Sequence, residues 1–146
     1  MRNETVEVEL KNVVKNPTGV ALLLGNKEKV FVIYVDLLMG EQIYNAFNQV
    51  RSVARPLSYQ LMHHLCLGFN IELQRIVITR MDKGVFFTRI IFRQSSDNFT
   101  KVLELDARPS DAILLAMVNQ KTILVAKTLF EELPDANDLI EKLTKQ

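Results

Sequence analysis

The segment Leu103–Ala116 constrains the fold more than any other part of the chain, because it joins an apolar strand to an apolar helix through a short charged turn. Pro109 suits the first helical position, where its missing N–H would be unpaired in any case and its fixed φ is already helical. Ser110 and Asp111 then fall in the first turn, where side-chain oxygens accept from free backbone N–H groups and negative charge suits the helix dipole. The corner gathers four polar side chains, which are Asp106, Arg108, Ser110 and Asp111.

Apolar periodicity predicts a series of strands and helices around this corner. Alternating or continuous apolar runs indicate strands at 6–11, 20–24, 30–35, 71–80, 85–92, 101–106 and 122–126. Amphipathic stretches indicate helices at 36–50, at 55–68 and from 109 onward, with shorter helical pieces at 129–133 and about 136–144. The pattern predicts one compact α+β domain over residues 1–146, with a core over about 6–133 and a mostly antiparallel or mixed sheet.

The helix predicted at 55–68 carries a strongly apolar stripe. The stripe consists of Leu57, Leu61, Met62, Leu65, Cys66 and Phe69. The stripe gives this helix one apolar face, and we expect Cys66 to be a small buried hydrophobe. His63 and His64 fall outside the stripe, and adjacent helical residues point about 100° apart, so they do not form the i, i+4 pair that binds one metal.

The overall composition narrows the function classes. Eighteen basic and seventeen acidic residues leave a formal net charge of +1, so nucleic-acid binding requires a local patch rather than a global charge. Cys66 is the single cysteine, which excludes an intrachain disulfide and a Cys-rich zinc site. No apolar run approaches the length of a membrane helix, and the N-terminus has no apolar signal core, so we expect a cytoplasmic protein without membrane association.

Two stretches of the chain, 20–50 and 85–120, resemble each other. Each has the pattern of two strands, a short turn and an amphipathic helix. A constant offset that pairs Asp36 with Asp106 also pairs Glu41 with Asp111 and aligns the apolar positions between them. We therefore predict a duplicated β-β-α unit, in which both copies place carboxylates at the strand end and in the first helical turn.

Two motifs carry a resemblance to a known family. Residues Arg55–Leu61 read Arg-Pro-Leu-Ser-Tyr-Gln-Leu, and residues Asp106–Ile113 read Asp-Ala-Arg-Pro-Ser-Asp-Ala-Ile. Over about Val6–Leu133, the chain resembles the bifunctional nuclease domain family of bacteria and plants. The resemblance implies a compact α+β domain that self-associates, with a dimer favoured. It also implies hydrolysis of phosphodiester bonds in RNA or DNA, an activity linked to the plant members.

Several positions depart from the family pattern. Where the family reads Arg-Pro-Leu-Thr-His followed by Asp or Glu, this chain has Ser58, Tyr59 and Gln60. Where the family has a glycine and, three residues on, a glutamate, this chain has Asp36 and Met39. The departures remove an imidazole and two carboxylates, so the activity implied by the resemblance is expected to be weak or lost.

The candidate chemistry follows from what phosphodiester cleavage requires. The reaction needs a nucleophile and stabilisation of charge on the phosphoryl oxygens, which many nucleases obtain from divalent metals held by carboxylates. Under the resemblance, Asp106 and Asp111 are the candidate ligands of Mg²⁺ or Mn²⁺ and, together with Glu41, the candidate catalytic groups. Guanidinium and hydroxyl groups bind phosphate oxygens, and the candidate substrate-binding residues are Arg55, Ser58, Arg108 and Ser110.

A second function class fits the same residues. In a non-catalytic oligomeric module for binding or assembly, the residues after Arg108 would simply start a helix, and Asp106 would pair with Arg108 to fix the corner. Exposure distinguishes the two classes. Buried aspartates with every oxygen bonded favour the structural role, whereas Asp106 and Asp111 lining an open cleft with Glu41 favour an enzyme.

Overall fold

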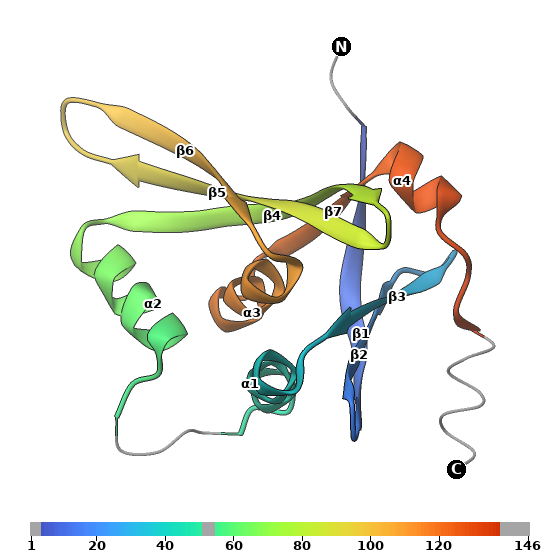
Figure 1. Cartoon of the computed structure of the whole chain (residues 1–146). Coiled ribbons are helices and arrows are strands. Elements are labelled where there is room, and N and C mark those ends of the chain that lie inside the picture. The colour runs from blue at the N-terminus through green and yellow to red at the C-terminus, as the bar shows by residue number, and fades with distance from the viewer. Residues whose placement is uncertain (1–3, 51–54, 138–146) are drawn as a thin grey trace.

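The structure is a computed structural model that describes residues 4–50 and 55–137 (Figure 1). Its strands are β1 (Thr5–Asn16), β2 (Gly19–Gly25), β3 (Val30–Val35), β4 (Ile71–Asp82), β5 (Val85–Ser95), β6 (Thr100–Ala107) and β7 (Thr122–Ala126). Its helices are α1 (Leu37–Phe47), α2 (Ser58–Gly68), α3 (Pro109–Asn119) and α4 (Lys127–Glu132). None of the helices within these ranges is long and apolar enough to cross a membrane. The helix predicted at about 136–144 falls almost entirely outside the described residues.

The seven strands form one mixed sheet in the order β3-β2-β1-β7-β4-β5-β6. Neighbouring strands are antiparallel except β4 and β7, which are parallel. β1 joins the two halves of the sheet, because Thr5–Val8 pair with β7 whereas Glu9–Asn16 pair with β2, with a register shift just after Leu10. The predicted α+β fold and its mostly antiparallel, mixed sheet are confirmed.

Apolar packing places the helices on the sheet. Figure 1 shows α1, α2 and α3 together on one side of the sheet. α1 packs against α3, β1 and β2, and α3 also packs against β4, β5 and β7. Ile43 of α1 and Ile113 of α3 are fully buried in the shared core. The apolar stripes that the sequence shows on these two helices therefore determine where the helices sit.

The sheet curves until its two halves meet beside α4. The ring of Phe31 on β3 lies 6.4 Å from that of Phe86 on β5, between centroids, although four strands separate β3 from β5 in the sheet. Phe130 of α4 stands edge-on to Phe31 at 6.3 Å, a favoured aromatic geometry. This aromatic group packs β3, β5 and α4 together where the two halves of the sheet meet.

The chain after α4 covers the β3 edge of the sheet. Ala136 N donates to Val30 O at 2.6 Å, and Val30 N donates to Asp135 Oδ1 at 3.2 Å. Hydrogen bonds from Val30 and Asn137 lower the pKa of the Asp135 carboxyl. Lys29 Nζ completes the closure by donating to Phe130 O at 2.6 Å. Backbone groups at this edge thus find partners within the chain.

The two predicted β-β-α stretches, β2–β3–α1 and β5–β6–α3, lie at opposite ends of the sheet. Their junctions do not match at the predicted offset. Asp36 is the N-cap residue of α1, whereas the N-cap residue of α3 is Arg108, two residues beyond the Asp106 with which Asp36 was paired. The duplication itself stays a prediction.

The apolar stripe of α2 is exposed, and the prediction that Cys66 is buried is wrong, since Cys66 is only half-buried. No residue of α2 is buried, and Leu61 and Leu65 are 62% and 58% exposed. α2 packs on the molecule through Tyr59 and a half-buried Cys66, whose thiol pKa is raised by that partial burial. Periodicity marks an apolar face, but it does not identify what covers that face. Within the described residues, nothing covers this one.

A glycine-to-alanine pair tests the packing of α1 on the sheet. A Cβ added at Gly40 would overlap Cβ and Cγ2 of buried Val20, so we expect Gly40→Ala to lower the free energy of unfolding by about 1–3 kcal/mol. Gly68→Ala is the matched control, because its Cβ meets nothing within 4 Å and alanine favours the helix by about 0.5–1 kcal/mol. Urea denaturation measures both. Equal effects of the two substitutions would contradict the packing of Gly40 on Val20.

Candidate functional site

The corner between β6 and α3 is fixed from behind by a buried threonine. Thr88 on β5 is fully buried, and its hydroxyl donates to the carbonyl of Ala107, the last residue of β6. Arg108 follows in an extended conformation as the N-cap residue, and Pro109 starts the helix as predicted. No side chain caps α3. The corner is therefore positioned by the end of the strand and by proline, which leaves its charged side chains free of that task.

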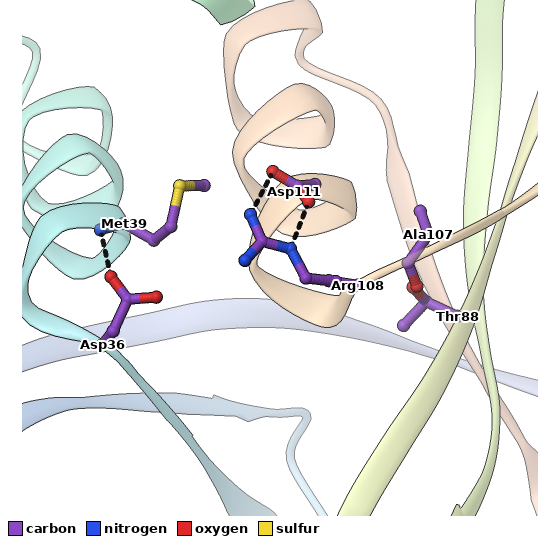
Figure 2. A network of polar contacts seen from close by, with 6 residues as sticks. All are labelled: Asp36, Met39, Thr88, Ala107, Arg108 and Asp111. Atoms are coloured by element: carbon purple, nitrogen blue, oxygen red, sulfur yellow. Dashed lines mark hydrogen bonds and ion pairs between the residues drawn. The ribbon is translucent and has the colours of Figure 1, made fainter.

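Arg108 and Asp111 form a two-pronged ion pair across the first turn of α3. Arg108 Nε lies 2.7 Å from Asp111 Oδ2, and the terminal nitrogen Nη2 lies 3.3 Å from Oδ1 (Figure 2). The pair expected between Arg108 and Asp106 is not observed, because Asp111 holds the guanidinium instead. Asp111 raises the pKa of Arg108 through this hydrogen bond and its charge, and Asp36 adds a smaller contribution.

The N-terminus of α1 lies beside this ion pair. Asp36 caps α1 by accepting from Met39 N at 2.8 Å (Figure 2). Its charge acts on Arg108, so the starts of α1 and α3 are close in space. Met39, which occupies a position where the family has a carboxylate, packs against the core and lines the space between the two helices.

An open groove of about 740 Å³ runs between these helix starts, α2 and the end of β6. Its walls are mostly apolar and include Leu38, Met62, Phe92 and Leu105. Its polar lining residues are Gln42, Ser58, Tyr59, Arg108 and Asp111, with Asp106 at the strand end, where alternation turns its side chain to the opposite sheet face from Leu105. The groove therefore brings residues of the two family motifs together, although about fifty positions of chain separate them.

Three of the predicted site residues do not line the groove. Arg55 lines a second cavity of about 850 Å³, together with Tyr59, Gln60, His63 and His64. Ser110 is 5% exposed and lines neither cavity. Glu41 is exposed on α1 and also lines neither. The corner is thus open, as an enzyme requires, but the groove is not shared with Glu41.

The donors available to a metal are few. Asp111 is engaged by Arg108, and Asp106 lies opposite Arg89 on β5, where strand alternation gives it the sheet face of Glu104. Within residues 4–50 and 55–137, no three His, Cys, Asp or Glu side chains gather closely enough to hold an ion. A sparse donor set still suits Mg²⁺, which keeps several of its waters and needs one or two protein oxygens.

Gln60, which replaces a carboxylate of the family pattern, has a structural role at the start of α2. Its Oε1 accepts from Leu57 N at 2.8 Å, so it caps the first turn of α2 from the third helical position. Glutamate and glutamine both perform this task, so replacing a family carboxylate by Gln60 preserves the cap. The spacing of Leu57 and Gln60 is the signal that could have revealed this role.

Comparison with known proteins gives one family match. The model of the bifunctional nuclease domain matches residues 21–137. No curated protein matches the chain. The matched range contains every residue that lines the groove and every residue that lines the second cavity.

The corner ion pair is expected to contribute little to stability. Because Arg108 and Asp111 are 65% and 42% exposed, Asp111→Asn should lower the free energy of unfolding by less than about 1 kcal/mol. Asp36→Ala, which removes the side chain that caps α1, should cost about 1 kcal/mol, whereas Asp36→Asn keeps the acceptor. Urea denaturation compares the three variants. If Asp111→Asn instead lowered the free energy of unfolding by several kcal/mol, the ion pair would be needed for the stability of the fold.

Proposed function

The chain belongs to the bifunctional nuclease domain family, and from this membership we propose that it is a nuclease-like protein that hydrolyses phosphodiester bonds of RNA or DNA. The observation that supports the proposal is the exposed guanidinium of Arg108, held by Asp111 at an open groove. A planar guanidinium matches two phosphate oxygens, so Arg108 can exchange one oxygen of Asp111 for a phosphodiester. The single cysteine, half-buried and unpaired, suits the cytoplasm as the compartment of action.

The groove residues divide the work of the reaction. Arg108 binds the phosphoryl oxygens and offsets the negative charge that grows on them in the transition state. Asp111 holds the guanidinium in orientation, and Ser58 offers a hydroxyl to the same phosphate from α2. Asp106 and Asp111 are the residues that would hold Mg²⁺ or Mn²⁺, and such an ion supplies charge stabilisation and a more acidic bound water. The geometry assigns no step to Glu41.

The second candidate function is a non-catalytic oligomeric module for binding or assembly. The observation that favours it is the exposed apolar stripe of α2, because an apolar face of this size on a small domain marks an interaction surface. Loss of the family imidazole at Tyr59 points in the same direction. The two functions share the groove and differ in whether the bound phosphodiester is cleaved.

Cleavage of single-stranded RNA and DNA tests the proposal directly. Protein purified free of host nucleases is incubated with each substrate, with and without Mg²⁺ or Mn²⁺. We expect metal-dependent cleavage that falls at least about 100-fold in the Asp106→Asn/Asp111→Asn variant, since groups that stabilise transition-state charge contribute factors of this size. Asp82→Asn, at an exposed hairpin turn outside both cavities, is the matched control.

Two outcomes decide between the candidates. Unchanged cleavage in the Asp106→Asn/Asp111→Asn variant would remove these residues from the site. Oligonucleotide binding without cleavage by the wild-type protein would select the non-catalytic module. Fluorescence anisotropy of a labelled single-stranded oligonucleotide measures this binding, and Arg108→Gln is expected to weaken it about 10-fold or more, because charged hydrogen bonds to phosphate contribute about 1.5–3 kcal/mol.

A further inference from the structure

Within the described residues, the two edges of the sheet differ, because the chain bonds to the start of the β3 edge and leaves the β6 edge without a partner. The residues after α4 bond to Val30 at the β3 edge. At the opposite edge, β6 pairs with β5 alone within the described residues. Figure 1 shows β6 standing free along that edge, above α2. An uncovered strand presents a row of backbone N–H and C=O groups that another strand can pair with.

Apolar side chains are exposed on both faces of β6. Val102 is 63% exposed on one face, and Leu103 and Leu105 are 45% and 43% exposed on the other. Phe99 just before the strand and the stripe of α2 add to this surface, and Met62 of α2 lines the same groove as Leu105. These side chains form an exposed apolar surface of the kind that marks a protein interface, and a standard interface buries about 800 Å² per partner.

We propose that a second copy of this chain covers the bare edge. Two β6 strands pair antiparallel around a two-fold axis at Leu103, and Lys101 of each copy thereby completes the groove of the other. The role of Lys101 rests on the function proposed above, whereas the interface does not. A closed two-fold dimer uses the same patch on both copies, so no apolar edge is left over to extend into a filament.

Charge and strand length select the register. A two-fold axis perpendicular to the sheet pairs residues of the same face. Centring at Leu103 pairs nearly all of Thr100–Ala107 and sets Val102 opposite a glutamate and Thr100 opposite an aspartate. Centring at Glu104 instead places two carboxylates directly opposite each other, which is destabilising. Centring at Val102 leaves the end of β6 without a partner.

In this register, a lysine side chain of each copy lies beside the groove of the other copy. Lys101 comes to lie opposite Leu105 of the partner subunit, on the sheet face that lines the groove. Within its own chain, Lys101 is five residues from Asp106 along β6, about 16 Å, which is beyond the reach of its side chain. The ammonium group joins Arg108 as a second positive charge for a bound phosphodiester. Each groove is thus incomplete in a single copy.

Self-association of the full chain tests the interface. We expect light scattering with size exclusion to give twice the chain mass for the wild type. Leu103→Glu, which places two carboxylates at the axis, should weaken dimerisation about 100-fold. Val85→Glu is the control, since Val85 is 58% exposed at the start of β5, away from β6, and should leave the dimer intact. A monomeric wild type at about 100 μM would overturn the interface.

A cysteine at the two-fold axis tests the register in a dimer that stays intact, unlike the dimer of Leu103→Glu. In a Cys66→Ala background, we expect Leu103→Cys to form an interchain disulfide under mild oxidation, since residues opposite each other have Cβ atoms about 4.5–5.5 Å apart. Val85→Cys in the same background should stay uncrosslinked. A dimer in which Leu103→Cys fails to crosslink would overturn the register, and with it the placement of Lys101.

Mixed dimers test whether Lys101 acts on the partner's groove. Lys101→Gln and Asp111→Asn each should lower cleavage at least about 10-fold while the dimer persists. A mixture of the two variants forms heterodimers with one intact groove, so about a quarter of wild-type activity should return. No recovery would show that Lys101 acts within its own chain or not at all. Oligonucleotide binding replaces cleavage as the readout if the wild type only binds. A wild-type dimer that does neither would overturn the proposed function and the role of Lys101, while the interface would stand.

Discussion

The packing of α1 against α3 over the sheet is the constraint on which the groove depends. Ile43 and Ile113 are fully buried where these helices meet, and burial of side chains of this kind contributes about 1.5–3 kcal/mol each. The exposed pair of Arg108 and Asp111 contributes at most about 1 kcal/mol. The helix starts are therefore placed by apolar packing, with the end of β6 held from behind by Thr88. The charged residues at the corner are left available for a ligand.

The sequence was sufficient where a local rule decides the structure. Proline at the first helical position placed the start of α3, and apolar runs placed the strands. Periodicity was not sufficient to place the surroundings of α2 and β6, because it shows that a face is apolar without showing which molecule covers it. The structure likewise brings some of the predicted site residues together and leaves others apart. The groove joins Ser58 to the corner, but Glu41 and Arg55 depend on how two helices are rotated relative to each other, which no local pattern encodes.

The departures from the family pattern carry less weight in the structure than in the sequence. Gln60 replaces a carboxylate, yet it holds the first turn of α2 by the same bond that glutamate would make. Met39 replaces another carboxylate and packs between the helices as part of the groove wall. Tyr59, which replaces the imidazole, lines both cavities and packs against the core. The changes at Tyr59 and Met39 remove ionisable groups from the groove, whereas Gln60 lines only the second cavity.

The exposed apolar surface at β6 and the small number of polar groups in the groove have the same proposed explanation, which is that a second copy of the chain is missing from both. A small domain gains by covering exposed apolar surface, and a groove whose Arg108 is already paired with Asp111 gains by acquiring a second cation. A two-fold contact along β6 satisfies both needs with the same residues, because alternation puts Leu103 on the axis and Lys101 across from the groove wall. The stability of the dimer and the function of its grooves are then linked by mass action, so activity per chain rises with protein concentration until dimerisation is complete. That concentration dependence separates a groove shared by two copies from one that a single copy completes.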